Sequence, residues 1–591
     1  MNSNGLIHFN IPVGLLVWFL VVIAPLRAEP ISIKVIVTAD VHAAVFPFDF
    51  MNNEPMQGSL ARVKTYVDHL RTQTNVILLD NGDMLQGQPS GYYYNFVATD
   101  QPHLIKETMH MMQYDAATLG NHDIETGPQV YNRLNDAFDF PWLAANIIHV
   151  KSGDPYFQPY TIIEREGVKI AVMGLATPSV PYWLPRKLWE GLEFASMYAT
   201  AQKWMAHIME NENPDAVVGL FHSGAGPHLE YKGDDMYLEN ASRYVAQYVS
   251  GFDVVFAAHD HQLRNEKIIN TSSGDEVLLL AGMPYGRSVA EVELVFHKNA
   301  DGTTVMHNKI PSIVNTSELE PCEKLMQEFE ESFDAVKDYI NEPLGRMENK
   351  ITSRESYFGN SAFTDFVHYM QREFTGAEIS FAAPLSFDAT IEEGTLKMYD
   401  MFKIYQFENY LYVMELSGQE IKDFLEFSYG RWFHTMTHED DNLLLFRRDS
   451  EGEIIKNQEG IAHLQNAYFN FDSASGIIYT VDVSQTPGNR ITISAMEDGS
   501  SFDLEKTYNV AINSYRGSGG GDHLTKGAGI EHEQLESRIK FVSDADLRSH
   551  MAAYIREKGQ LAPEKDTNWT IYPVLWAEKA SRRDHKILFG E

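Results

Sequence analysis

The sequence contains a single cysteine, Cys322, in a chain of 591 residues. This scarcity excludes an intramolecular disulfide and any centre built from several thiolates. A metal ion would therefore have to be held by histidine, carboxylate or amide side chains. The glycine-rich stretch at 518–522 is not followed by Gly-Lys-Ser/Thr, so a P-loop is excluded as well.

Basic residues are scarce too. The chain has 47 Lys and Arg against 82 Asp and Glu, a formal net charge of −35. This balance argues against a nucleic-acid polymer or an anionic membrane as the main partner, because both favour a basic surface. A small anion is still permitted, since metal ions or a few cations can reverse the field locally. A hydrophobic fraction of 44% is ample for buried cores, and the length suggests two to four domains.

Long apolar runs are limited to residues 11–24, near the N-terminus. This run is short for a membrane span and has the length of a signal-peptide core, so we expect a signal peptide over residues 1–28. The preceding residues lack Lys and Arg, and Leu26 is not small, so an uncleaved anchor stays an alternative. After cleavage we expect no stable membrane insertion. Export without disulfides fits a bacterial periplasm.

From residue 31 to about 300, β-rich apolar runs alternate with amphipathic helical stretches. Alternation of this kind predicts an α/β domain of layered, sandwich type with buried sheets, which we assign to residues 31–315. The apolar runs are 31–39, 75–80, 115–120, 169–176, 215–221, 252–258 and 276–282.

A charged stretch at 318–340 has Leu325, Phe329, Phe333 and Val336 at helical spacing. It predicts a linker helix with one packed side, within residues 316–345.

The remaining pattern predicts an α+β C-terminal domain over residues 346–565, with strands at 379–384 and 410–416. Ser417 and Glu420 have the spacing of a capping box at the start of a helix. We expect residues 566–591 to be a solvated C-terminal tail.

Several apolar runs of the first domain end in residues that can bind metals. Strand ends in α/β sheets are where ligand sites form, because the backbones converge there. One such residue alone is more often a cap or a turn former, but the ordered set predicts a dinuclear site with Asp83 as the bridge. The motifs are Asp40-Val-His42, Gly82-Asp83, Gly120-Asn121-His122-Asp123, His222 and His259-Asp-His261.

These motifs resemble the five motifs of calcineurin-like metallophosphoesterases. The second domain resembles the C-terminal substrate-binding domain of 5′-nucleotidases, and the two resemblances together cover about residues 31–560. The second-domain motifs are Tyr405-Gln-Phe407-Glu-Asn409, Leu416-Ser-Gly418, Asn513-Ser-Tyr515-Arg516 and Gly519-Gly520-Gly521-Asp522.

The resemblance implies two divalent cations, Zn, Mn, Co or Fe, that activate a water for attack on phosphorus. One cation would take Asp40, His42, Asp83 and His261; the other would take Asp83, Asn121, His222 and His259.

The resemblance also implies that His122 protonates the leaving alkoxide. Many 5′-nucleotidases place Asp three residues after this histidine, whereas this chain has Glu125. Either Glu125 or the neighbouring Asp123 could orient His122, and both assignments stay open.

The substrate implied is a small nucleotide. Phe407 and Tyr515 match the two aromatic residues that clamp the base, where stacking contributes about 1–3 kcal/mol per base. Asn409 and Asp522 match positions that hydrogen-bond base and ribose. Phe407 alone could equally be a core residue, since its neighbours are apolar.

Within the family, the stretch Phe381-Ala-Ala-Pro384-Leu-Ser-Phe387-Asp388 lacks the arginine that usually binds phosphate in 5′-nucleotidases and UDP-sugar hydrolases. It is similar to the periplasmic 2′,3′-cyclic-nucleotide 2′-phosphodiesterase/3′-nucleotidases, which hydrolyse cyclic phosphates and 3′-nucleotides to nucleoside and phosphate. Two alternatives stay open: a 5′-nucleotidase or UDP-sugar hydrolase, and a non-catalytic nucleotide-binding surface protein. The oligomeric state is not predicted.

Overall fold

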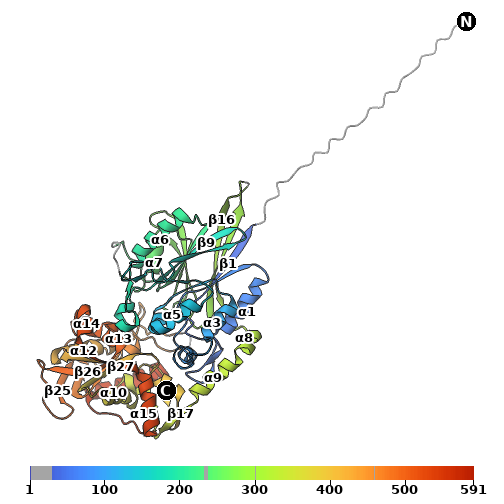
Figure 1. Cartoon of the computed structure of the whole chain (residues 1–591). Coiled ribbons are helices and arrows are strands. Elements are labelled where there is room, and N and C mark those ends of the chain that lie inside the picture. Colours follow the sequence, from blue (N-terminus) through green and yellow to red (C-terminus); the bar gives the residue numbers. More distant parts are fainter. Residues whose placement is uncertain (2–29, 232–236, 300, 458–459, 591) are drawn as a thin grey trace.

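The computed structural model describes Met1 and residues 30–231, 237–299, 301–457 and 460–590. The predicted signal peptide and its cleavage site lie outside the described residues. Figure 1 shows two bodies, one built from the N-terminal half and one from the C-terminal half, with two helices running along one edge.

Two six-stranded sheets form the first body. The first sheet has the order β16-β15-β1-β4-β5-β6: β16 (Thr304–Asn315), β15 (Ser288–Lys298), β1 (Ile31–Thr38), β4 (Asn75–Asp80), β5 (Ala116–Thr118) and β6 (Trp142–Leu143). The second has the order β13-β14-β12-β11-β9-β8: β13 (Arg264–Ile269), β14 (Glu276–Ala281), β12 (Val254–Ala257), β11 (Ala216–His222), β9 (Val168–Ala176) and β8 (Tyr160–Arg165).

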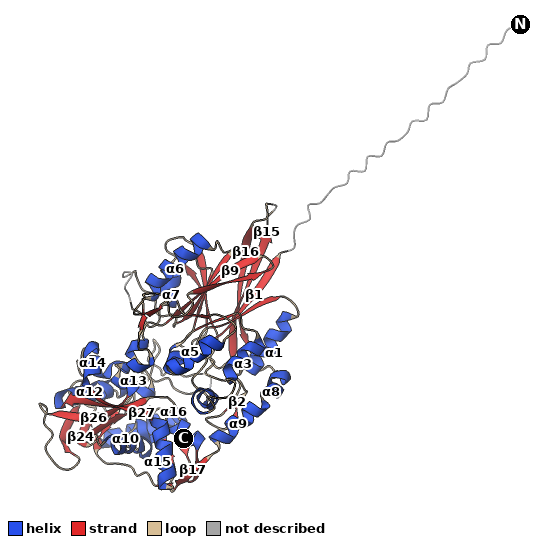
Figure 2. Ribbon diagram, viewed as in Figure 1, coloured by secondary structure: helices blue, strands red, loops and turns tan. Residues whose placement is uncertain are grey.

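The sheets pack face to face, as the side chains of β1 show. Ile33, Val35 and Val37 lie in the core between the sheets, whereas Ile36 lies in the core on the outer face. Helices cover both outer faces (Figure 2). The first sheet is covered by α1 (Leu60–Arg71), α3 (Leu104–Met112) and α5 (Pro128–Ala137), and the second by α6 (Met197–Asn211) and α7 (Ser242–Tyr248). The predicted layered sandwich is confirmed.

The stretch predicted as one linker helix forms two helices, α8 (Glu323–Glu328) and α9 (Glu330–Ile340). Phe329 separates them with φ −107° and ψ 21°, outside the helical region. Leu325 and Val336 are fully buried against the first body, as their helical spacing indicates.

The second body is built on a five-stranded sheet with the order β23-β19-β26-β22-β27. These strands are β23 (Ser473–Ser475), β19 (Ile379–Ala382), β26 (Thr507–Asn513), β22 (Tyr410–Ser417) and β27 (Ile539–Asp546). α10 (Ala362–Thr375), α11 (Met398–Ile404) and α15 (Leu547–Lys558) pack on one face and α12 (Gly418–Trp432) on the other. The predicted capping box starts α12: Glu420 N–H donates to Ser417 Oγ and Ser417 N–H to Glu420 Oε2.

Residues 566–591 differ from the expected solvated tail. β29 (Trp569–Tyr572) pairs in parallel with β24 (Ile477–Asp482), and α16 (Val574–Phe589) buries Ala580 and Leu588 in the core of the second body. The expectation was wrong because the basic residues of this segment occupy the outer side of α16, while small and apolar residues recur at helical spacing on the inner side.

Candidate active site

The seven predicted metal ligands come together at one end of the sandwich. They follow or end strands β1, β4, β5, β11 and β12 of both sheets, whose carboxyl ends meet on the same side. These residues include two groups of three, and within each group the candidate ligand atoms lie within 4.8 Å of one another. This is the division that the family resemblance implies. The groups are Asp40, His42 and His261, and Asp83, His222 and His259.

The backbone at these ligands is unusual. Five of the seven have positive φ angles: Asp40 51°, His42 50°, Asp83 58°, His259 71° and His261 53°. Non-glycine residues avoid this region, which costs about 1–3 kcal/mol where it occurs and is concentrated at functional sites. The surrounding fold therefore holds the ligand loops in conformations that these residues would not adopt alone.

Two glycines allow the ligand loops to approach closely. A Cβ on Gly82 would lie 2.6 Å from Gly120 N and 2.7 Å from His222 Nδ1. A Cβ on Gly120 would overlap the carboxylate of Asp83. A side chain at Gly82 would displace His222 or the Gly120 backbone, and one at Gly120 would displace the Asp83 carboxylate.

Backbone carbonyls fix two of the imidazoles. His42 Nδ1 lies 2.8 Å from Gln86 O, and His222 Nδ1 lies 2.7 Å from Asn81 O. Because a carbonyl only accepts hydrogen bonds, each Nδ1 carries a proton, and Nε2 is the nitrogen left for another partner. Neutral imidazole with a free Nε2 is the form that binds a metal.

Both Nε2 atoms lie close to other candidate ligand atoms. His42 Nε2 lies 3.0 Å from His261 Nε2, and His222 Nε2 lies 3.2 Å from both Asn121 Oδ1 and Asp83 Oδ2. Burial lowers the pKa of His222, but the carboxylate of Asp83 outweighs burial and raises that pKa to about 10. The site therefore favours positive charge among its acceptor atoms, and the residues present fit two divalent cations.

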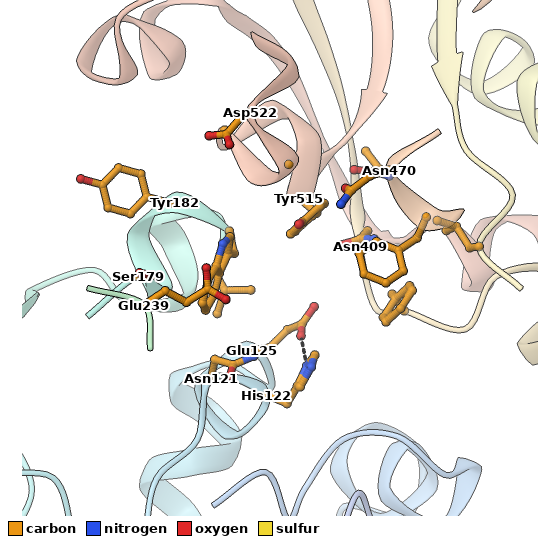
Figure 3. Close-up of a pocket in the computed structure, with 18 of the residues that line it drawn as sticks. Asn121, His122, Glu125, Ser179, Tyr182, Glu239, Asn409, Asn470, Tyr515 and Asp522 are labelled. Atoms are coloured by element: carbon orange, nitrogen blue, oxygen red, sulfur yellow. Dashed lines mark hydrogen bonds and ion pairs between the residues drawn. The ribbon is translucent and has the colours of Figure 1, made fainter. Parts of the chain in front are cut away.

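His122 lies on α4 (Asn121–Glu125), and its side chain meets Glu125. Its backbone N–H donates to Asp83 Oδ1 at 2.8 Å, and its ring Nδ1 lies 2.6 Å from Glu125 Oε2 (Figure 3). Burial lowers the pKa of His122, but the Asp83 and Glu125 carboxylates outweigh it and raise it to about 9. Nδ1 is thus occupied by Glu125, which leaves Nε2 for a substrate.

The carboxylate of Asp123, in contrast to that of Glu125, binds backbone N–H groups. Its fully buried carboxylate accepts four backbone N–H groups, from Asp83, Met84, Leu85 and Gly120, at 2.8–3.0 Å. It therefore ties the loop of Asp83 to the start of α4. Of the two residues considered for orienting His122, Glu125 is the one whose carboxylate contacts the His122 ring.

Sequence reasoning missed two further residues. Buried Asn81 donates from Nδ2 to Phe221 O and Phe256 O, both at 3.0 Å, and so joins the two sheets next to the ligands. Glu239 Oε1 lies 3.3 Å from His259 Nε2. Asn81 stands just before the Gly-Asp motif, but Glu239 stands in no motif, so only the fold reveals it.

A cavity of about 1280 Å³ separates the ligand loops from the second body. Metal ligands, His122 and Glu125 line one side, and the predicted substrate residues line the other. Figure 3 shows Asn409, Tyr515 and Asp522 facing Asn121 and Glu125 across this space. All four predicted substrate residues, Phe407, Asn409, Tyr515 and Asp522, lie on the wall.

The glycine-rich turn wraps a buried arginine. Arg516 is 1% exposed, forms an ion pair with Asp472 at 2.6 Å and donates to Gly520 O at 2.6 Å. A Cβ on Gly521 would overlap the guanidinium, and one on Gly520 would lie 2.6 Å from the ring of Tyr515. The glycines therefore let the turn close around Arg516 and place Tyr515 on the cavity wall.

A layered α/β sandwich whose strand ends gather two imidazole–carboxylate clusters defines a metal-dependent hydrolase. Residues 33–263 match the model of the calcineurin-like phosphoesterases, and residues 342–526 match that of the 5′-nucleotidase C-terminal domain. The chain belongs to the calcineurin-like metallophosphoesterases that carry a C-terminal 5′-nucleotidase domain, and it is an enzyme that hydrolyses phosphoesters.

Curated relatives align over nearly the whole chain. A 2′,3′-cyclic-nucleotide 2′-phosphodiesterase/3′-nucleotidase from Yersinia enterocolitica is 25% identical over 609 residues, covering 92% of this chain and 89% of the relative. The protein of the same name from Salmonella typhimurium is 25% identical and covers 93% and 90%. A 5′-nucleotidase from Vibrio cholerae is 25% identical over a shorter part, 64% of this chain and 72% of the relative.

Solved structures share the fold. A Staphylococcus aureus protein proposed to be a 5′-nucleotidase superposes with a TM-score of 0.75 at 20% identity, covering 91% of this chain and 99% of that one. A 5′-nucleotidase precursor from Thermus thermophilus superposes with a TM-score of 0.61 at 19% identity, covering 92% and 99%.

Proposed function

We propose that this enzyme hydrolyses nucleoside 2′,3′-cyclic phosphates and 3′-nucleotides to nucleoside and phosphate. The observation that carries the proposal is the arrangement of two metal-ligand clusters and a set of base-binding side chains on opposite walls of one cavity. The names of the Yersinia and Salmonella relatives support this substrate class.

Two divalent cations would be held by Asp40, His42, Asp83 and His261 on one side and by Asp83, Asn121, His222 and His259 on the other. Bound there, they supply Lewis acidity and positive charge for a phosphoryl group. The chain itself fixes the ligand geometry through the Gln86 and Asn81 carbonyls and through the Asp123 carboxylate.

His122 is the residue that we assign to the leaving group. Glu125 holds Nδ1–H, so the protonated ring can donate from Nε2 to the departing sugar oxygen. With a cyclic phosphate, water adds to phosphorus, the bond from phosphorus to O2′ breaks, and O2′ receives the proton. The resulting 3′-nucleotide then loses phosphate in the same way, with a second water.

The second body supplies recognition of the nucleoside. Phe407 and Tyr515 offer aromatic faces for the base, and Asn409 and Asp522 offer hydrogen-bonding groups for base and ribose. Positive charge is needed only where the phosphate binds, which is compatible with a chain whose net charge of −35 disfavours long polyanions.

Product analysis with 2′,3′-cAMP, 3′-AMP, 5′-AMP and UDP-glucose, run with Zn²⁺, Mn²⁺, Co²⁺ and Fe²⁺, tests the proposal. We expect turnover of the first two substrates to exceed that of the others. Rapid hydrolysis of 5′-AMP beside an inert cyclic substrate would instead assign the enzyme to the 5′-nucleotidases.

We also propose that the protein is exported, with the bacterial periplasm as its compartment. The support is the signal-peptide pattern over residues 1–28. Within the described part of the chain, no helix is both long and apolar enough to cross a membrane. Fractionation of cells that express the full chain, with N-terminal sequencing of the product, checks this assignment.

A further inference from the structure

Arg548 is a fully buried cation at the start of α15. Its guanidinium donates to the carbonyls of Tyr405 and Gln406, each at 3.2 Å, and forms an ion pair with Glu408 Oε1 at 2.7 Å. These three residues flank Phe407, and Glu408 is followed by Asn409. Arg548 therefore holds the backbone segment that presents two of the cavity-lining side chains.

The same guanidinium also contacts the catalytic body. It lies 4.5 Å from the ring centre of Tyr92, on α2 (Pro89–Tyr92) of that body, and 3.9 Å from the ring centre of Phe402, on α11 of its own body. The Tyr92 hydroxyl hydrogen-bonds Asp546 at 3.1 Å and Ser549 at 2.8 Å. Tyr92 is buried, so this contact belongs to the packed interface between the two bodies.

Tyr92 is connected in turn to the metal-ligand loop. α2 begins three residues after Gln86, whose carbonyl fixes His42, and Gln88 N–H donates to His42 O at 2.9 Å. One buried side chain thus joins the segment around Phe407 to the segment that holds a metal ligand.

Helix stability does not account for this arginine. A cation in the first turn of a helix faces the positive end of the helix dipole, which is unfavourable. Burying the charge is costly as well, unless its partners are in place. Without Arg548, the buried Glu408 carboxylate and two carbonyls would lose their donor, and the segment 405–409 would have to move toward water.

We propose that Arg548 is a positioning residue that sets the Phe407–Asn409 segment at the right place for the nucleobase, opposite the metal centre. This inference rests on the proposed function, because it assumes that a nucleoside occupies the cavity. The role proposed for Arg548 concerns binding of the base, and other residues carry out the chemistry at phosphorus.

The test compares Arg548→Met with the full-length parent enzyme on two substrates, 3′-AMP and the base-free p-nitrophenyl phosphate. We expect the KM for 3′-AMP to rise about tenfold or more, the size of one lost stacking contact. We expect kcat/KM for p-nitrophenyl phosphate to stay within about threefold. Arg548→Lys, which retains the charge, should recover part of the nucleotide KM.

Arg490→Met is the matched control. Arg490 is also buried, at 1% exposure, but it donates to Tyr429 O and Phe433 O, away from the cavity-lining segment. Its loss should leave the nucleotide KM unchanged. Should Arg548→Met fail to fold, Glu408→Gln weakens the same ion pair and should raise the nucleotide KM in the same selective way.

Equal losses on both substrates, or an unchanged nucleotide KM in a folded variant, would overturn the inference. If the proposed function is wrong, the parent enzyme itself will not hydrolyse 3′-AMP, and this result is distinct from a failure of the Arg548 inference. In that case the comparison is repeated with whichever nucleotide the parent does hydrolyse, and the same selective rise in KM is required.

Discussion

His122 and Glu125 form a pair one helical turn apart, with ring Nδ1 and carboxylate Oε2 at 2.6 Å. Glu125 is buried, whereas the side chain of His122 is 25% exposed toward the cavity. The pair therefore has a buried carboxylate behind the imidazole and a free Nε2 in front of it. This is the orientation that a proton donor to a leaving group requires.

Replacing Glu125 by Gln removes the negative charge behind the imidazole while preserving its size. We expect kcat for 3′-AMP to fall by about 10–100-fold, because the protonated form of His122 loses a charged partner. The loss for p-nitrophenyl phosphate should be under about threefold, since its leaving group needs no proton. Steady-state kinetics on both substrates measure the difference, and equal losses would assign Glu125 a general structural role.

Replacing Asp83 by Asn should remove the bridge between the two cation sites. We expect at least about a 100-fold loss of kcat and fewer than two bound metals per chain, measured by metal analysis beside activity. Asp68→Asn is the control, because the Asp68 carboxylate is half-exposed on α1 and pairs with Lys64, away from the ligand loops. Near-normal turnover and full metal content in Asp83→Asn would refute the bridging assignment.

A methyl group at Gly120 would collide with the bridging carboxylate. Gly120→Ala should therefore lower metal content and activity together, with a loss of stability of about 1–3 kcal/mol from overpacking. At Gly359 a Cβ would meet nothing within 4 Å, so Gly359→Ala should leave activity and metal content unchanged. Full activity in Gly120→Ala would show that the loop can shift without loss of the site.

α16 provides a test of the corrected C-terminus. Leu588 is 3% exposed and Leu575 is 70% exposed on the same helix. We expect Leu588→Ala to cost about 2–5 kcal/mol of unfolding free energy and Leu575→Ala less than about 0.5 kcal/mol. Denaturant unfolding measures both. Similar small effects would mean that the helix is not packed in solution.

His368 should make stability fall in acid. It is buried between Ser380 Oγ and Ser473 Oγ, and burial lowers its pKa to about 3. Below pH 6.5 the imidazole of His368 is protonated in the unfolded chain but stays neutral in the folded chain. Its contribution to the free energy of unfolding is therefore complete above that pH and is lost as the pH falls. Between pH 7 and pH 5 the parent should lose about 2 kcal/mol more than His368→Gln. A pH-independent difference between the two proteins would contradict this.

Local patterns in the sequence determined the main features of this protein. Strand and helix periodicity predicted the layered sandwich, and the residues at strand ends predicted which imidazole and carboxylate side chains gather at one end of it. Ser417 and Glu420 predicted a helix start, because a capping box lies within four consecutive residues. Each of these signals is contained in a short window, so no knowledge of distant contacts was needed.

Tertiary structure decided what depends on distant partners. Asp123 and Glu125 are equally plausible beside His122, and the choice follows from the N–H groups of a loop some 40 residues earlier, which occupy Asp123. The basic residues of the C-terminal segment predict a solvated tail, whereas in the structure this segment forms α16. Asp584 on α16 accepts hydrogen bonds from the N–H groups of Leu443 and Leu444. Arg548 stands in no motif, because Glu408 lies 140 residues earlier in the chain and Tyr92 belongs to the other body. A buried charge is defined by what surrounds it, and those surroundings are assembled only by the fold.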